Sequence, residues 1–441
     1  MSSIAARLRG LMTPREGAAV VSPREPAAQA HARRSDAAQV LDGLWQDVAG
    51  RRFLVIDRAY TPGHRHGDVV IADALPPAGA PWPRLPLLSG GANRRIGSGT
   101  LLFLDLETTG LTGGAGTYAF LVGCAWFEPP SPLASAPRGD GTFRIRQFFL
   151  SDFDAERTLL DAVKEAASEA GAVVTYNGKA FDLPLIETRC VLHRKATPFD
   201  GVPHIDMLHP ARRLWRGAEA DVASASSSCR LSALERSICG YVREGDVPAF
   251  EIPSRYFHYV RTGDARPLAA VLDHNRLDLL SLALLTSRAA RLLEDGPASA
   301  RTAREAFGLG QLFLRGGMTR EAGACFARAV DLTGDLTTHA EALRAHAVLS
   351  RRERRHEEAA GAWRRILRLK PCPPQIFREA TEALAVHHEH RLRDPGTARA
   401  FALQSLPLQG SPTRRQAIHH RLARLSRKMG QTHASAEAAL F

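Results

Sequence analysis

The sequence predicts a two-part protein, in which an α/β domain built on a mixed sheet is followed by an all-α region of paired helices. Two observations lead to this prediction. Between residues 101 and 294, short apolar runs bounded by Gly, Pro or Ser alternate with segments of helical periodicity. After Pro297 the strand-like runs stop, and amphipathic helical segments recur with a similar order of small and large residues.

The composition is that of a globular protein. The chain has 441 residues, 44% of them hydrophobic and 24% charged, which suffices for two or three cores and excludes collagen and wholesale disorder. No apolar run approaches the roughly 20 residues that cross a bilayer, so we expect no membrane association. The six cysteines form no CxxC pair, which fits a reducing compartment, and we expect a cytoplasmic protein.

The positive charge gathers in the last third of the chain. Residues 300–441 hold 24 Lys and Arg against 13 Asp and Glu, whereas the whole chain has a net charge of +12. Such a segment can follow nucleic-acid phosphates. A general preference of the protein for Arg would give the same count, since nearly all the cations are Arg, and both interpretations stay open.

We expect residues 1–97 to be a leader and a poorly defined region, because residues 1–45 are rich in Ala, Arg, Pro and Ser and have no sustained period. The first strand is expected at Leu101–Glu107. Strands at Thr117–Phe127 and Phe143–Leu150 follow after gaps of loop length, which favours an antiparallel meander.

An α/β pattern follows the meander and completes a domain over residues 98–296. Asp154–Ala170 has helical periodicity behind an acidic first turn, and Ala172–Tyr176 is a short buried type of strand. Further elements are expected after these, namely helices over Phe181–His193, Pro210–Trp215, Leu231–Cys239 and Leu268–Glu294, and a strand around His204–Leu208.

Residues 297–441 are expected to form helical repeats. Gly310, Ala322 and Phe326 are followed 37 residues later by Ala347, Ala359 and Trp363, which is close to the tetratricopeptide period of about 34. A weaker third copy runs from Ile376 to Leu406. Small residues at these positions let paired helices approach closely. A generic helical bundle is the alternative.

Asp105 and Glu107 stand two residues apart in the apolar run LLFLDLE, so both side chains point to the same face of the predicted strand. Two such carboxylates repel each other, and a divalent cation would compensate them. A solvated surface is the usual explanation of an isolated pair. Here the flanking residues are typical of a buried strand, and a polar turn follows at Thr108.

Two further acidic positions lie far along the chain. Asp182 follows Asn177 at the carboxyl end of the predicted strand, where ligands bind in α/β folds, although a helix N-cap is the simpler role for one Asp. His274 and Asp278 are four residues apart and share one face of a helix. A salt-bridged histidine is the simpler interpretation of that pair.

The order of these residues resembles the DEDD superfamily of 3′–5′ exonucleases, whose domain has the ribonuclease H-like fold. Three stretches are similar to the bacterial YprB family, in which tetratricopeptide repeats often follow the nuclease domain, namely HIDMLHPARRLWR, CRLSALERSICGYVREGDVPAFEIPSRYFHYVRTGD and LDHNRLDLLSLALL. By this resemblance, Asp105, Glu107, Asp182 and Asp278 correspond to the metal ligands, and His274 to the general base. The base lies at the spacing at which related enzymes have Tyr, so Asp273 competes for this role.

The resemblance implies a metal-dependent 3′–5′ exonuclease that acts on single-stranded DNA or RNA with two Mg²⁺ or Mn²⁺ ions. Thr108 and Asn177 are expected to contact the terminal nucleotide, and Phe181 is expected to lie in the core. The helical repeats are expected to offer a site for a protein partner. A noncatalytic scaffold with a vestigial nuclease domain and a structure-specific endonuclease are the alternative functions.

Overall fold

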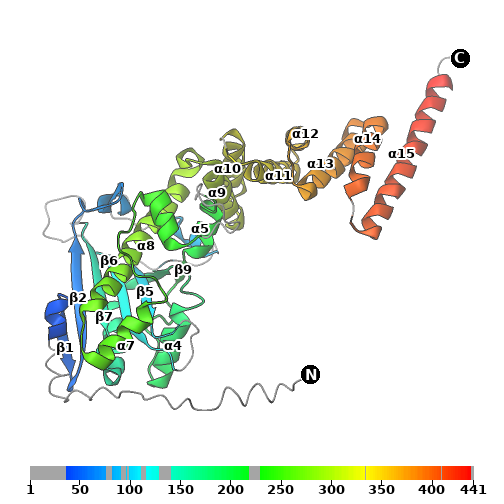
Figure 1. Ribbon diagram of the computed structural model, residues 1–441. Helices are drawn as coiled ribbons and strands as arrows, with labels where there is room; N and C mark the ends of the chain where they lie inside the picture. Colours follow the sequence, from blue (N-terminus) through cyan, green and yellow to red (C-terminus); the bar gives the residue numbers. More distant parts are fainter. Residues whose placement is uncertain are drawn as a thin grey trace, which may run out of the picture.

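A computed structural model describes residues 36–75, 82–90, 96, 99–110, 116–128, 141–217, 229–332, 334–408 and 410–438. These residues form a part that contains a sheet and a row of helices that extends away from it (Figure 1). The prediction of a mixed-sheet α/β part followed by an all-helical region of paired helices is confirmed.

The main sheet has seven strands in the order β1-β2-β7-β6-β5-β8-β9. Its centre is the expected antiparallel meander of β5 (Thr100–Thr108), β6 (Ala119–Phe127) and β7 (Phe143–Phe149). On the other side of β5, the strands β8 (Ala170–Thr175) and β9 (His204–Asp206) run parallel to it. The carboxyl ends of β5, β8 and β9 therefore lie at one edge of the sheet, where ligands bind in α/β folds.

The sheet begins earlier in the chain than the sequence predicted. β1 (Leu44–Val48) pairs with β2 (Arg51–Tyr60), and β2 pairs with β7, so the expectation of a poorly defined region is wrong for these residues. β2 is half exposed, and it is fixed by contacts with a strand distant in sequence, such as the 2.6 Å ion pair between Asp57 and Arg146. The leader residues 1–35 lie outside the described residues.

The predicted helices of this part are present, and they cover the sheet (Figure 1). Tyr256 and Tyr259 are fully buried on one helix that was not expected, and they anchor that helix against the core. The hydroxyl of Tyr256 donates a hydrogen bond to the carbonyl of Leu150 at 3.1 Å. The helices are α3 (Glu156–Ala166), α4 (Asp182–Leu192), α5 (Leu208–Leu214), α6 (Leu231–Leu234), the unexpected α7 (Ile252–Thr262) and α8 (Ala269–Asp295).

Helices that pack in antiparallel pairs make up the C-terminal region. Gly310 shows why small residues recur there, because a Cβ at this position would lie 2.5 Å from the ring of the buried Phe326. The pairing is confirmed, whereas the assignment to the tetratricopeptide family stays a prediction. The helices are α9 (Ala303–Arg315), α10 (Thr319–Asp331), α11 (Leu336–Arg352), α12 (His356–Arg368), α13 (Pro374–His387), α14 (Pro395–Ser405) and α15 (Pro412–Ala438).

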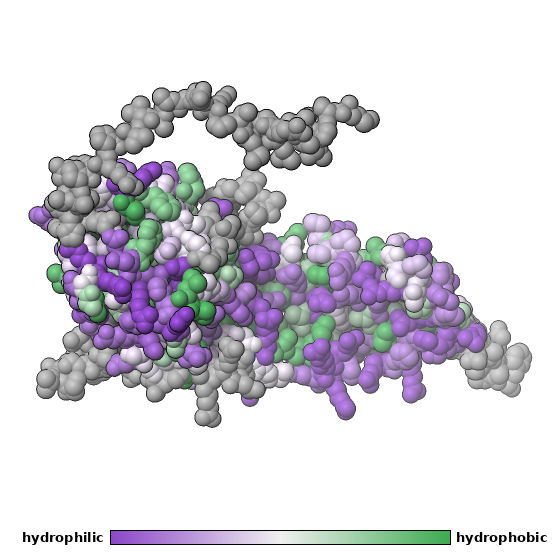
Figure 2. Space-filling model, turned by 90° about the horizontal axis from the view of Figure 1, so that it is seen from below, coloured by the Kyte–Doolittle hydropathy of each residue, from purple (hydrophilic) through white to green (hydrophobic). Residues whose placement is uncertain are grey.

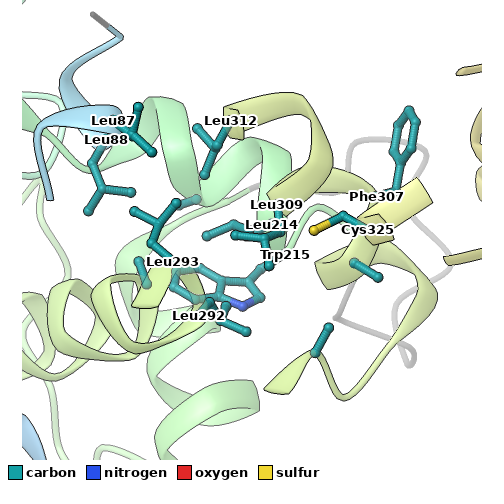
Figure 3. Close-up of a cluster of buried hydrophobic side chains, with 14 of the residues drawn as sticks. Leu87, Leu88, Leu214, Trp215, Leu292, Leu293, Phe307, Leu309, Leu312 and Cys325 are labelled. Carbon is teal, nitrogen blue, oxygen red and sulfur yellow. The ribbon is translucent and has the colours of Figure 1, made fainter. Parts of the chain in front are cut away.

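A continuous hydrophobic core joins the two parts. Figure 3 shows Trp215 among leucines of α5, α8 and α9. The indole Nε1 of Trp215 donates a hydrogen bond to Glu305 of α9 at 2.9 Å. A Cβ at Gly308 would lie 2.3 Å from the carbonyl oxygen of Arg213, so α9 and α5 are in direct backbone contact. The helical region is thus packed onto the sheet domain as well as linked to it.

The surface of the helical region is mainly hydrophilic on the face that Figure 2 shows, with smaller apolar areas between the polar ones. Among the helices that the structure describes, none is long and apolar enough to pass through a bilayer.

Candidate functional site

The predicted acidic residues come together at one cavity of about 490 Å³. Asp105 and Glu107 reach it from β5, Asp182 from the first turn of α4, and His274 and Asp278 from α8. Three stretches of sequence thus converge on one place, because the long helix α8 packs against β5 and α4 begins beside the carboxyl end of that strand.

A close contact between α8 and the sheet holds Asp105 in place. Asn275 donates hydrogen bonds from its Nδ2 to the carbonyl and to Oδ2 of Asp105, at 3.2 and 2.8 Å, and its own Oδ1 accepts one from Gln147 at 2.8 Å. The neighbouring strand carries Gly123 opposite Asp105, where a Cβ would lie 2.3 Å from Oδ1 of Asn275. Only glycine leaves room for the amide that orients this carboxylate.

The carboxylates of the cavity raise one another's pKa. Burial raises the pKa of Asp105 well above its usual value, and the charges of Asp278, Glu107 and Asp182 raise it further. The pKa of Glu107 is raised in the same way, by burial first and then by Asp278 and Asp182. Burial, with Asp206 and Asp278, raises the pKa of Asp182 to about 7. The site therefore brings together carboxyl groups whose charged forms repel one another and are disfavoured by burial.

Asp278 has a cationic partner that the sequence analysis missed. Its Oδ1 accepts a 2.5 Å hydrogen bond from Nη2 of Arg243, a side chain that is 6% exposed. Within the described ranges, no three His, Cys, Asp or Glu side chains are already grouped closely enough to hold a metal ion. The donor chemistry is nevertheless that of a hard divalent cation, because four carboxylates with no thiol surround the cavity.

His274 is held on both sides by carboxylates. Its Nδ1 lies 2.6 Å from Oδ1 of Asp246, and its Nε2 lies 3.6 Å from Oδ2 of Asp278. A carboxylate accepts but does not donate, so the contact with Asp246 assigns a proton to Nδ1, and Nε2 lies at the cavity wall beside Asp278. Asp273 is instead exposed, pairs with Arg276 and does not line the cavity.

The two expected nucleotide contacts differ in position. Thr108 lines the cavity, and its hydroxyl donates to the carbonyl of Gly110 at 2.9 Å. Asn177 does not line the cavity but begins the turn that leads to Asp182, with a φ of 67°. The backbone N–H of Asn177 donates to Asp206 at 2.8 Å, so this turn is fixed by the end of β9.

The expectation that Phe181 lies in the core is wrong. Its side chain is 58% exposed and lines the cavity next to Asp182. A single aromatic residue before a helix gives no periodic signal of burial, and the turn that precedes α4 directs it outward. An exposed ring beside a carboxylate cavity is suited to stack on a planar group.

Arg243, Asp246 and Asn275 are the functional candidates that the sequence reasoning did not find. Asn275 had a signal, because it stands between His274 and Asp278, both of which the sequence singles out. The other two lie in the segment that precedes α7, where no periodicity singles out a residue.

The carboxylates of the cavity lie within the part of the chain that matches a known superfamily. Residues 102–290 match the RNase H superfamily, a range that starts on β5 and ends on α8. The chain is also 29% identical over 381 residues to the uncharacterized protein YprB of Bacillus subtilis (strain 168), a similarity that spans 85% of this chain and 86% of that protein. The chain therefore contains a domain of the RNase H superfamily and is distantly similar to YprB over most of its length.

Proposed function

We propose that this protein is a metal-dependent phosphodiester hydrolase, and that it acts as a 3′–5′ exonuclease on single-stranded DNA or RNA. One observation supports the proposal above all others. Asp105, Glu107, Asp182 and Asp278 line one cavity of an RNase H-like domain, and the first three hold raised pKa values because of burial and mutual repulsion. Nucleic acid, whose phosphates are bridged by cations, is the substrate class that fits such a site.

The proposed cofactor is a pair of Mg²⁺ or Mn²⁺ ions. Asp105, Glu107, Asp182 and Asp278 would hold them, since their oxygen donors suit hard cations and their repulsion disappears on binding. Bound ions would supply Lewis-acid activation of the phosphodiester and of water. Arg243 contacts Oδ1 of Asp278, whereas Oδ2 lies toward His274.

The remaining roles fall to residues around these carboxylates. His274 would take a proton on Nε2 from the attacking water, because Asp246 holds its Nδ1 and directs the other nitrogen toward the cavity. Thr108 would position the terminal nucleotide from the end of β5. Asn177 would act through the turn that carries Asp182, since it lies outside the cavity lining.

Digestion of end-labelled oligonucleotides tests this proposal directly. With Mn²⁺ present, the purified protein should shorten a 5′-labelled single strand one nucleotide at a time from a free 3′ end. A strand whose 3′ end is blocked should stay intact. Matched DNA and RNA strands would identify the preferred sugar, because only a contact to the 2′-hydroxyl separates the two. Cleavage inside the blocked strand would indicate an endonuclease, and no cleavage of any strand would favour a noncatalytic scaffold.

Phe181→Ala should weaken the binding of a single strand. Base stacking on an aromatic ring contributes about 1–3 kcal/mol, so we expect KM to rise by about 5- to 150-fold, with kcat changed much less. Phe181 is 58% exposed, and its removal should leave the melting temperature nearly unchanged. Phe250→Ala is the matched control, since Phe250 is 74% exposed but does not line the cavity. Equal KM values for the two variants would rule out a stacking role.

A further inference from the structure

A fully buried carboxylate lies behind the candidate site. Glu235, in the π-helical turn that follows α6, is 0% exposed, and its Oε1 accepts hydrogen bonds from Nε2 of His66 at 2.8 Å and from the hydroxyl of Ser281 at 2.6 Å. Its Oε2 accepts a 2.6 Å bond from Nε of Arg243. Burial opposes the charge of Glu235, yet these hydrogen bonds and Arg243 keep its pKa below the usual value. Glu235 is therefore a fixed anion in the interior.

Arg243 connects this anion to the cavity. While its Nε is bound to Glu235, its Nη2 donates to Oδ1 of Asp278 at 2.5 Å and its Nη1 donates to Oδ2 of Asp246 at 3.3 Å. A guanidinium is planar and rigid, so its three hydrogen bonds have directions that are fixed relative to one another. Both terminal nitrogens contact residues of the candidate site. An arginine that only neutralised Glu235 would not need these two contacts.

The contact with Asp246 extends the chain of hydrogen bonds to the proposed base. Oδ1 of Asp246 accepts from Nδ1 of His274 at 2.6 Å and from the backbone N–H of Val247 at 2.9 Å. The orientation of the imidazole is thus fixed by a carboxylate that Arg243 itself holds. Asp278 and His274 then face each other across 3.6 Å at the cavity wall.

We propose that Arg243 is a positioning residue, which uses the buried Glu235 as an anchor to direct Oδ2 of Asp278 and, through Asp246, Nε2 of His274 into the cavity. This inference rests on the proposed function, because it gives Asp278 the role of a metal ligand. Arg243 leaves one oxygen of that carboxylate available, so it orients the ligand and does not replace the cation. Hydrogen bonds of this kind to metal-binding carboxylates typically contribute 10- to 100-fold in metal affinity.

Arg243→Lys separates the charge of Arg243 from its geometry. A lysine ammonium can still pair with Glu235, but it cannot reach Asp278 and Asp246 at the same time in fixed directions. We therefore expect the affinity for Mn²⁺, measured by titration calorimetry without substrate, to fall about 10- to 100-fold. Arg276→Lys is the matched control, because Arg276 is on α8 but contacts Tyr60 and Asp273 instead of the cavity. It should bind Mn²⁺ as the wild-type protein does.

The titration tests the positioning role of Arg243 and the proposed metal site separately. Unchanged Mn²⁺ affinity in Arg243→Lys would overturn the positioning role, and tighter binding would overturn it too, because the guanidinium would then compete with the cation. A wild-type protein that binds no Mn²⁺ would instead refute the proposed metal site. If Arg243→Lys does not fold, the double variant Glu235→Gln/Arg243→Gln replaces the buried ion pair by two neutral amides, and the same loss of affinity is expected of it.

Discussion

Replacing Asp105 by asparagine is expected to lower the rate of strand degradation by at least about 10³-fold. Loss of one metal-binding carboxylate removes several kcal/mol of charge stabilisation, and each 1.36 kcal/mol corresponds to a factor of ten in rate. Asparagine has the same shape, and it can still accept the hydrogen bond that Asn275 now donates to Asp105 at 2.8 Å. The effect should therefore fall on catalysis and leave the fold intact.

The stability of Asp105→Asn separates this explanation from unfolding. Because burial and three acidic neighbours raise the pKa of Asp105, the neutral asparagine should make the metal-free protein as stable as the wild type or more stable. Asp161→Asn, at an exposed carboxylate of α3 that pairs with Lys195, is the control and should keep full activity. Strand degradation that persists undiminished in Asp105→Asn would reveal a contaminating nuclease.

The free energy of unfolding of the metal-free protein should fall as the pH rises, because Asp182 loses its proton in the folded state. Asp182→Asn should remove this loss. The pKa of Asp182 is about 7 in the folded protein, against a usual value of 3.8. Between these values the folded state binds more protons than the unfolded state, so this group destabilises the fold as the pH rises from about 4 to 7. Above pH 7 the penalty is complete and constant.

The comparison of Asp182→Asn with the wild type isolates this contribution. Several histidines titrate in the same range with the opposite sign, because burial lowers their pKa, but both proteins contain them. At pH 8 the variant should be more stable on the order of 2 kcal/mol, since each pH unit counts for about 1.4 kcal/mol and water screens the half-buried side chain. At pH 4 the two proteins should unfold at the same denaturant concentration. A pH-independent difference would contradict the raised pKa.

The central strands and the acidic residues could be predicted from the sequence, because their signals are local. β5, β6 and β7 are apolar runs between breakers, and the pair Asp105 and Glu107 is conspicuous within such a run. β2 could not be predicted in this way, since its pairing partner β7 lies about 90 residues further on. A local sequence pattern can identify a strand, but it does not identify the distant strand with which that strand pairs.

The hydrogen bonds around the site could not be predicted from the sequence for a similar reason. Arg243 acquires its role from Glu235 on one side and Asp278 on the other, and the sequence between them shows no sign of this. The expectation for Phe181 was wrong because the type of a side chain does not show whether a turn leaves it exposed. The charged residues that line a cavity can thus be proposed from motif spacing, whereas those that orient them require the fold.

The packing of Trp215 against α9 attaches the first helix of the helical region directly to the sheet part. Gly308 and Glu305 of this helix contact the C-terminal end of α5. The same buried cluster includes leucines at the C-terminal end of α8, whose N-terminal half carries Asp278. The position of α9 relative to the helix that carries Asp278 is therefore fixed by side-chain packing and does not depend on the linker alone. A cut at residue 296 would expose leucines of α8 that α9 now covers, so we expect the sheet part to lose stability without the helical region.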